Sequence, residues 1–233
     1  MKIVVSDYDR TFHTAIEDLK ENQRAVKLFR EQGNIFVFAT GRSYQDFKRE
    51  ADRYQLHYDY VIINHGAMIL DQHDRILYHV EIDDSVIESL QRVLRLELCT
   101  YSFCCSGKES RLQITDSHLS KIHLEYNDDR TAREVEFDVN TTYEGKLIAY
   151  HISDCKLEIV ASSVNKAHAI SLLADKFHWD GSQIYTIGDG NTDLLMIKTF
   201  HGFRMNHSVS ALIPYAKGSY DSVFQMIYDI MEQ

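Results

Sequence analysis

The sequence predicts a doubly wound α/β fold: a mainly parallel, Rossmann-like sheet with a small α+β domain inserted into it. In the first 66 residues, short apolar runs alternate with segments long enough for a helix. This is the strand-helix-strand order of a parallel sheet. The same order returns after residue 164. Between these two segments the pattern changes to an alternation of apolar and polar residues, which is typical of half-buried strands. We therefore predict a core of residues 1–78 and 158–233 and an insert of residues 79–157.

The N-terminal half supplies three predicted strands and two helices. The β-branched run at residues 3–5 meets polar residues abruptly, as a strand buried on both faces does. A helix is predicted from about residue 21 to 32, and Gly33 suits its C-terminal cap. The elements that follow are a strand at 35–39, a helix at about 44–54 and a strand at 61–63.

The C-terminal half repeats this order, whereas the insert mixes the two kinds of element. A helix at about 164–177 precedes a strand at 184–187, and a further helix passes through Leu194 and Ile197. Within the insert we predict strands at 101–103, 122–126 and 147–150 and helices at about 84–97 and 129–137.

The composition excludes several classes of protein. The chain has 35 Asp and Glu residues against 25 Lys and Arg, a net charge of −10 that repels nucleic acid and anionic membranes. The N-terminus becomes charged too early for a signal peptide, and no stretch is long and apolar enough to span a membrane. Cys104 and Cys105 are adjacent rather than spaced for a metal site, which predicts free thiols. We expect a cytoplasmic protein that binds neither nucleic acid nor membranes.

Polar motifs directly follow three of the predicted core strands. They are the segments Asp7-Tyr8-Asp9-Arg10-Thr11, Thr40-Gly41-Arg42 and Gly188-Asp189-Gly190-Asn191-Thr192-Asp193. Ligands of a doubly wound sheet bind outside the carboxyl ends of its strands. Each motif is weak evidence by itself, but all three are expected to meet at one point in space.

Four carboxylates at that point, those of Asp7, Asp9, Asp189 and Asp193, would repel one another. Either a hard divalent cation binds between them, or some are protonated or paired. The sequence favours Mg²⁺, because no Cys or multi-His set is present to select zinc. Lys166 adds a compact cation that could hold a phosphate.

These motifs, in this order, resemble the four motifs of the haloacid dehalogenase superfamily. The insert lies between the second and third motifs, as in the type IIB members of that superfamily, the Cof-like sugar-phosphate phosphatases. Further similarities are the segments 64–67, before the insert, and 157–159, just after it. The resemblance covers most of both core segments, and inside the insert it depends on position and length.

The resemblance implies a role for each motif residue. Asp7 would be the nucleophile that forms an aspartyl-phosphate, and Asp9 the general acid that later acts as base. Thr40 and the amide of Gly41 would hold the phosphate, and Lys166 would offset the charge on nucleophile and phosphate. These roles fit phosphoryl transfer, in which catalysis is mostly positioning and charge stabilisation.

The resemblance also implies a metal site and a cap. Mg²⁺ would be held by Asp7, Asp189 and the backbone carbonyl of Asp9, with Asp193 orienting its water shell. Arg42 is assigned, with Gly41, to substrate binding. The insert would be a mobile cap that excludes water and contacts the leaving group.

Four positions depart from the family pattern. Arg10 and Phe12 stand where Gly and Leu are common, and Arg10 either reaches a second anionic group or points into solvent. Thr192 replaces an Asn that contacts phosphate in relatives, so a weakened phosphate contact is expected. His65 replaces a second Asn, and it either touches substrate or is structural.

The leading hypothesis is a Mg²⁺-dependent phosphatase that acts on a small phosphorylated metabolite, such as a sugar phosphate. Two alternatives stay open: a phosphomannomutase-like phosphotransferase, and a weakly catalytic regulator that binds phosphometabolites. Lys108, Arg111 and Lys121 are candidates for binding a second anionic group, or else ordinary surface charges. The substrate and the oligomeric state cannot be derived from the sequence.

Overall fold

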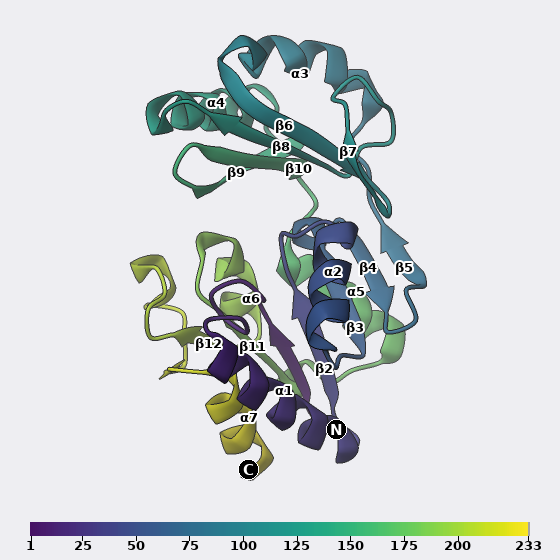
Figure 1. Ribbon diagram of the computed structural model, residues 1–233, viewed down its shortest axis with the longest axis vertical. Coiled ribbons are helices and arrows are strands. Elements are labelled where there is room, and N and C mark those ends of the chain that lie inside the picture. Colours follow the sequence, from purple (N-terminus) through teal and green to yellow (C-terminus); the bar gives the residue numbers. More distant parts are fainter. Residues whose placement is uncertain (233) are drawn as a thin grey trace.

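The apolar runs of the sequence form the central strands of an eight-stranded sheet. The computed structural model describes residues 1–232 (Figure 1). The strands are, in sheet order, β13 (Ser219–Tyr220), β12 (His201–Met205), β11 (Ile184–Gly188), β1 (Ile3–Ser6), β2 (Ile35–Ala39), β3 (Tyr60–Ile63), β4 (Met68–Asp71) and β5 (Ile76–His79). Strands β13 to β3 run parallel, and β4 and β5 extend the sheet as antiparallel strands.

Alternation along the central strands divides the apolar side chains between two faces. Val4 and Phe36 belong to one apolar cluster, and Val5 and Val37 to another. The first cluster includes residues of helices α1 (Ile16–Glu31), α2 (Tyr44–Tyr54) and α7 (Val223–Glu232), and the second includes residues of α5 (Lys166–Phe177) and α6 (Leu194–Thr199). Helices therefore cover both faces, and the predicted doubly wound fold is confirmed. None of the helices described in residues 1–232 is long and apolar enough to cross a membrane.

The helix ends follow local sequence signals. Helix α1 begins at Ile16, about five residues before the predicted start, with two acidic residues in its first turn that complement the helix dipole. Gly33 follows the end of this helix with φ +80°, and its amide donates to the carbonyl of Arg30 at 2.9 Å. The side chain of Asn165 caps α5 by accepting from the amide of His168 at 2.8 Å, which makes Lys166 the first residue of that helix.

The inserted segment forms a second, antiparallel sheet covered by two helices on one face. Its strands are, in order, β7 (Glu109–Leu112), β6 (Cys99–Ser106), β8 (Lys121–Tyr126), β10 (Lys156–Ala161) and β9 (Leu147–Ser153). Helices α3 (Ile87–Val93) and α4 (Asp129–Thr142) pack on it through one apolar cluster. Figure 1 shows this sheet lying between its own helices and the core, so its other face is turned toward the core. We call residues 80–161 the cap.

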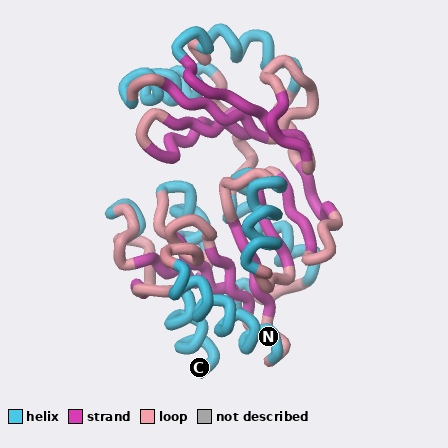
Figure 2. Tube along the Cα trace, in the orientation of Figure 1, coloured by secondary structure: helices cyan, strands magenta, loops and turns pink. Residues whose placement is uncertain are grey.

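The cap corrects the predicted helix at about 84–97. A 3₁₀ turn at Asp84–Val86 leads into the short helix α3, and Arg95, with φ +48°, separates α3 from a second 3₁₀ turn at Leu96–Leu98. The strand pairings also favour a C-terminal cap boundary later than residue 157, because β10 stays in the cap sheet as far as Ala161. The division into core and cap is our proposal, and Figure 2 shows the two sheets as separate bodies of strands.

Gly202 in β12 is expected to tolerate no side chain. A Cβ at this position would lie 2.5 Å from the carbonyl carbon of Ile197 and closer still to other backbone atoms of that residue. Because backbone cannot rotate away as a side chain can, Gly202→Ala should lower the free energy of unfolding by about 1–3 kcal/mol. Urea denaturation measures this loss. Gly181→Ala is the matched control, since a Cβ there meets nothing within 4 Å, and an equal loss in both variants would contradict the prediction.

Candidate active site

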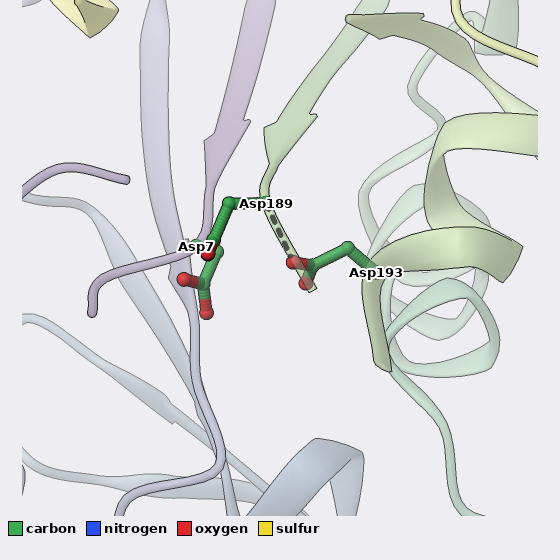
Figure 3. Close-up of side chains that lie close together, drawn as sticks. All are labelled: Asp7, Asp189 and Asp193. Carbon is green, nitrogen blue, oxygen red and sulfur yellow. Dashed lines mark hydrogen bonds between the residues drawn. The ribbon is translucent and has the colours of Figure 1, made fainter. Parts of the chain in front are cut away.

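The predicted motifs meet at the carboxyl edge of the core sheet. Asp7 follows β1, Thr40 follows β2, Asp189 and Asp193 follow β11, and Lys166 opens α5. All five line one cleft of about 550 Å³ between core and cap. The convergence follows from parallel strands, whose carboxyl ends lie on the same edge. Figure 3 shows the side chains of Asp7, Asp189 and Asp193 gathered at the ends of β1 and β11.

Lys166 bridges two carboxylates at the base of this cleft. Its Nζ lies 2.6 Å from Oδ1 of Asp7 and 2.6 Å from Oδ1 of Asp193, and the lysine is almost fully buried. The other oxygen of Asp193 accepts from the backbone amides of Asp189 at 3.0 Å and Gly190 at 2.9 Å. Asp193 therefore holds both the turn after β11 and the ammonium group that faces Asp7.

Burial and mutual repulsion disfavour the charged forms of Asp7 and Asp189. Burial raises the pKa of Asp7 to about 8, and Asp193 adds to this shift while Lys166 opposes it. Burial, followed by the charge of Asp193, also raises the pKa of Asp189. One oxygen from each of these three carboxylates lies within 4.8 Å of the others. Three buried carboxyl groups with hard oxygen atoms this close together fit a divalent cation.

Asp9 stands apart from that set because its carboxylate pairs with Arg42. Nε of Arg42 donates to Oδ2 of Asp9 at 2.8 Å, and Nη2 donates to Oδ1 at 2.7 Å. The guanidinium also lies over the ring of Tyr8, with Cζ 5.1 Å from the centroid. From the sequence we expected Arg42 to bind substrate. The bidentate contact with Asp9, which joins two separate motifs, could not be seen there.

The loop after β2 presents a hydroxyl donor to the cleft. The Thr40 side chain is buried, and its oxygen accepts from the amide of Arg42 at 3.1 Å, so its hydroxyl hydrogen can be donated to a ligand. Gly41 packs against the ring of His65, and a Cβ at Gly41 would lie 2.5 Å from Cε1 of that ring. Glycine is therefore needed for the loop to close over His65.

A second charged cluster, which the sequence analysis did not predict, joins the cap to this loop. We call it the hinge cluster; it consists of His65, Lys121, His123 and Glu158. One oxygen of Glu158 accepts from Nζ of Lys121 at 2.7 Å and lies 3.0 Å from Nδ1 of His123. Its other oxygen is hydrogen-bonded to Nε2 of His65. Nζ of Lys121 also donates to the carbonyl of Gly41 at 2.6 Å, which ties cap strand β8 directly to the loop after β2.

Three residues that depart from the family pattern line the same cleft. His65 lines it but is engaged with Glu158, and its contact with substrate stays a prediction. Arg10 has φ +59°, a largely exposed side chain, and Nε at 3.4 Å from Oδ2 of Asp189. Thr192 and Asn191 also line the cleft in the turn after β11, where Thr192 is half-buried and Asn191 is exposed.

Comparison with known proteins identifies relatives over nearly the whole chain. The sequence matches the haloacid dehalogenase-like hydrolase family over residues 4–111 and 105–223. It is 26% identical to an uncharacterized protein of Mycoplasma capricolum, over 86% of this chain and 88% of that protein. It is 22% identical to the 5-amino-6-(5-phospho-D-ribitylamino)uracil phosphatase of Bacillus subtilis, over 85% and 80% respectively.

The fold is also similar to solved structures. A haloacid dehalogenase-like hydrolase from Bacteroides thetaiotaomicron superposes with a TM-score of 0.82. The two sequences are 20% identical, and the alignment covers 98% of this chain and 99% of the other. Core and cap together therefore have the arrangement found in that protein.

Proposed function

The chain belongs to the haloacid dehalogenase-like hydrolases, and from this we propose that it is a Mg²⁺-dependent phosphatase acting on a small phosphomonoester. The observation that carries the proposal is the contact between Lys166 and Asp7 at the end of β1, with Asp9 two residues away. A buried carboxylate held against an ammonium group, beside a second carboxyl group that reaches the cleft, matches what a phosphoryl-transfer nucleophile and its acid-base partner need.

In the proposed first step, an oxygen of Asp7 attacks phosphorus in line with the ester oxygen. The phosphorus–oxygen bond to the leaving alcohol breaks, and Asp9 supplies the proton that this alcohol needs. The Thr40 hydroxyl, the Gly41 amide and the Lys166 ammonium would meet the phosphoryl oxygens and balance their charge. In the second step Asp9, now a carboxylate, takes a proton from water, which attacks the aspartyl-phosphate and releases inorganic phosphate and free Asp7.

Arg42 has a place in this scheme because it holds both oxygens of Asp9. To act as an acid, Asp9 must offer an oxygen to the leaving alcohol, and the guanidinium occupies both of its oxygens. We propose that Arg42 turns partly toward the incoming phosphate, which frees one oxygen of Asp9 for the proton. Thr192 and His65 stay in the proposed substrate-binding set at the edge of the cleft.

The resident cation is proposed to be Mg²⁺, held by Asp7, Asp189 and the backbone carbonyl of Asp9, with Asp193 orienting its water shell. Bound there, it would supply positive charge to the phosphoryl oxygens and to the nucleophile. The chemistry of the donor set supports this choice, since the clustered groups are buried oxygen ligands.

The substrate is proposed to be a small phosphorylated metabolite, such as a sugar phosphate. The Bacillus subtilis relative is named for a phosphorylated ribitylaminouracil, which makes that compound one member of the set to be tested. The two alternatives from the sequence, a mutase-like phosphotransferase and a phosphometabolite-binding regulator, are outcomes of the same experiment.

Phosphate release from a panel of phosphomonoesters, including an aryl phosphate, tests the proposal. We expect release in Mg²⁺ and its loss in excess chelator, with recovery when Mg²⁺ is restored. Release that is unaffected by chelator would contradict the metal assignment. Transfer to a sugar acceptor without net release would favour the phosphotransferase, and binding without either reaction would favour the regulator.

A further inference from the structure

Strand alternation in the cap sheet separates a buried face from a face that looks into the cleft. Ile122 and Leu124 of β8 enter the cap core against α3 and α4, while the residues between them do not. The cap residues that line the cleft from β6, β7 and β8 are Tyr101, Phe103, Arg111, Lys121, His123 and Glu125. This face would lie over the leaving group of a substrate whose phosphate sits at Asp7.

Among the residues that the structure describes, the cleft charges of the cap are paired at hydrogen-bond distance, with one exception. Lys121 is bound to Glu158 at 2.7 Å, and Glu125 is bound to Lys156 at 2.9 Å. Arg111 has no carboxylate closer than that of Asp46, at 3.9 Å. Asp46 itself already accepts from Arg49 at 2.5 Å. Arg111, whose side chain is 51% exposed, therefore has unused donors for an anion.

Two core arginines also line the cleft, but they face its other end. Arg42 is committed to Asp9, and Arg10 lies beside Asp189 at the cation site. Lys108, the third candidate from the sequence, has its Nζ 5.2 Å from the ring centroid of Tyr44 and is not among the cleft-lining residues. Arg111 is thus the cation placed toward the leaving group.

The guanidinium of Arg111 is held in place by aromatic rings. Its Cζ lies 4.5 Å from the ring centroid of Phe103 and 5.7 Å from that of Tyr101, and Nη1 donates to the Tyr101 hydroxyl. The ring of Phe103, in β6, stacks in turn on the ring of His123 in the neighbouring strand β8, with the ring centroids 4.7 Å apart. Stacking fixes the plane of a guanidinium, which prepares its fork of N–H donors for a carboxylate or a phosphate.

The backbone at Arg111 is irregular in a way that redirects its side chain. Between β6 and β7, Cys104 pairs with Leu112 and Cys105 with Ser110, so Arg111 is the extra residue of a β-bulge. Its φ of +69° is a left-handed conformation that a long side chain rarely adopts. Bulges beside active sites commonly re-aim a side chain, and strain of this kind persists where the surroundings enforce it.

We propose that Arg111, held on Phe103 and Tyr101, binds a second anionic group on the leaving part of the substrate. The substrate class is then a phosphomonoester that also carries a carboxylate or a second phosphate. This inference rests on the proposed phosphatase function and narrows it.

Matched substrate pairs test the proposal in the intact chain. One pair is 3-phosphoglycerate and glycerol 3-phosphate, and the other is fructose 1,6-bisphosphate and fructose 6-phosphate; an aryl phosphate reports basal activity. A hydrogen-bonded charge contact is worth about 1.5–3 kcal/mol, so wild type should prefer the doubly anionic member of at least one pair by about 10- to 150-fold in kcat/KM. The preferred pair tells whether the group is a carboxylate or a phosphate.

Arg111→Asn should reduce that preference to nearly one, because Asn accepts the left-handed backbone but carries no charge. Arg111→Lys should retain part of it, since the charge stays and the fork is lost. Lys108→Met is the control with unchanged preference. The inference would be overturned if the wild type showed no preference, or if the preference persisted in Arg111→Asn. Turnover of the aryl phosphate in the same experiment would still support the proposed phosphatase function. Absence of turnover on every substrate would overturn both.

Discussion

Asp7→Asn should abolish phosphate release from every substrate that the wild type hydrolyses. A neutral amide cannot attack phosphorus to form the acyl-phosphate, and loss of a nucleophile typically reduces turnover by about 10⁴-fold or more. The fold should survive the change. An Asn oxygen can still accept from Lys166, so the contact at the base of the cleft is kept.

Phosphate release and thermal unfolding, measured on the same preparations, check this prediction. Asp52→Asn is a suitable control, because Asp52 makes a 3.3 Å ion pair with Lys48 on α2 and its side chain is 66% exposed. The control should keep wild-type turnover. If Asp7→Asn, shown to be folded, retained more than a hundredth of wild-type turnover, a nucleophilic role for Asp7 would be untenable.

The core and its motif residues could be predicted because both depend on local sequence. Buried strands of a parallel sheet are short apolar runs, and the residues that follow them must lie on one edge. Asp7, Thr40 and Asp189 are brought together by that rule, and Lys166 is placed with them by the start of α5. The match to the haloacid dehalogenase-like hydrolase family confirms the resemblance that these motifs carry.

Elements with weaker local patterns could not be predicted. Strand β12 contains glycine and arginine, and β13 has two residues, so neither has the apolar run of a central strand. The predicted helix at about 84–97 has the composition of one helix, but the left-handed backbone at Arg95 divides it. Where a residue other than Gly has a positive φ, the packing around it imposes that conformation. The sequence signals such a position clearly only where the residue is Gly.

The contacts that define the cap side of the site are long-range, and sequence spacing says nothing about them. Glu158 meets His65 across 93 positions and Lys121 across 37. Alternation around Ile122 indicates that β8 has two faces, but which face meets the core depends on how the cap is docked. The β-bulge at Arg111 is a feature of strand pairing, which is visible only in the folded sheet.

Neutralising Glu158 of the hinge cluster is expected to destabilise the protein strongly. Lys121 is 2% exposed, and Glu158 is the carboxylate that balances its charge. Removing one partner of a buried ion pair costs about 3–5 kcal/mol, because an uncompensated charge is left without water. We therefore expect Glu158→Gln to lower the free energy of unfolding by that amount, although the amide keeps the size and part of the hydrogen bonding of the acid.

Chemical denaturation of the wild type and of Glu158→Gln measures the difference in their free energies of unfolding. The control is Glu88→Gln, which changes an exposed carboxylate of the cap that pairs with Arg92 and should shift stability by less than about 0.5 kcal/mol. Lys121→Met should also destabilise, and the double variant should lose less than the sum of the two, since neither charge then stays buried alone. Fully additive losses would mean that the two side chains act independently.

The dependence of this loss on pH follows from the surroundings of Glu158. Burial by itself would raise the pKa of this carboxyl, but the charge of Lys121 and the hydrogen bonds from His123 and His65 outweigh burial and hold it well below the ordinary 4.5. A carboxyl whose pKa is depressed by folding contributes stability that is fully present above its unfolded pKa and is lost as the pH falls toward the folded pKa. The gap between wild type and Glu158→Gln should thus be constant from about pH 6 to 8 and should narrow below about pH 4.5. A gap that widened as the pH fell would show that Glu158 is buried as the neutral acid, and the cap would then be held to the Gly41 loop without an ion pair.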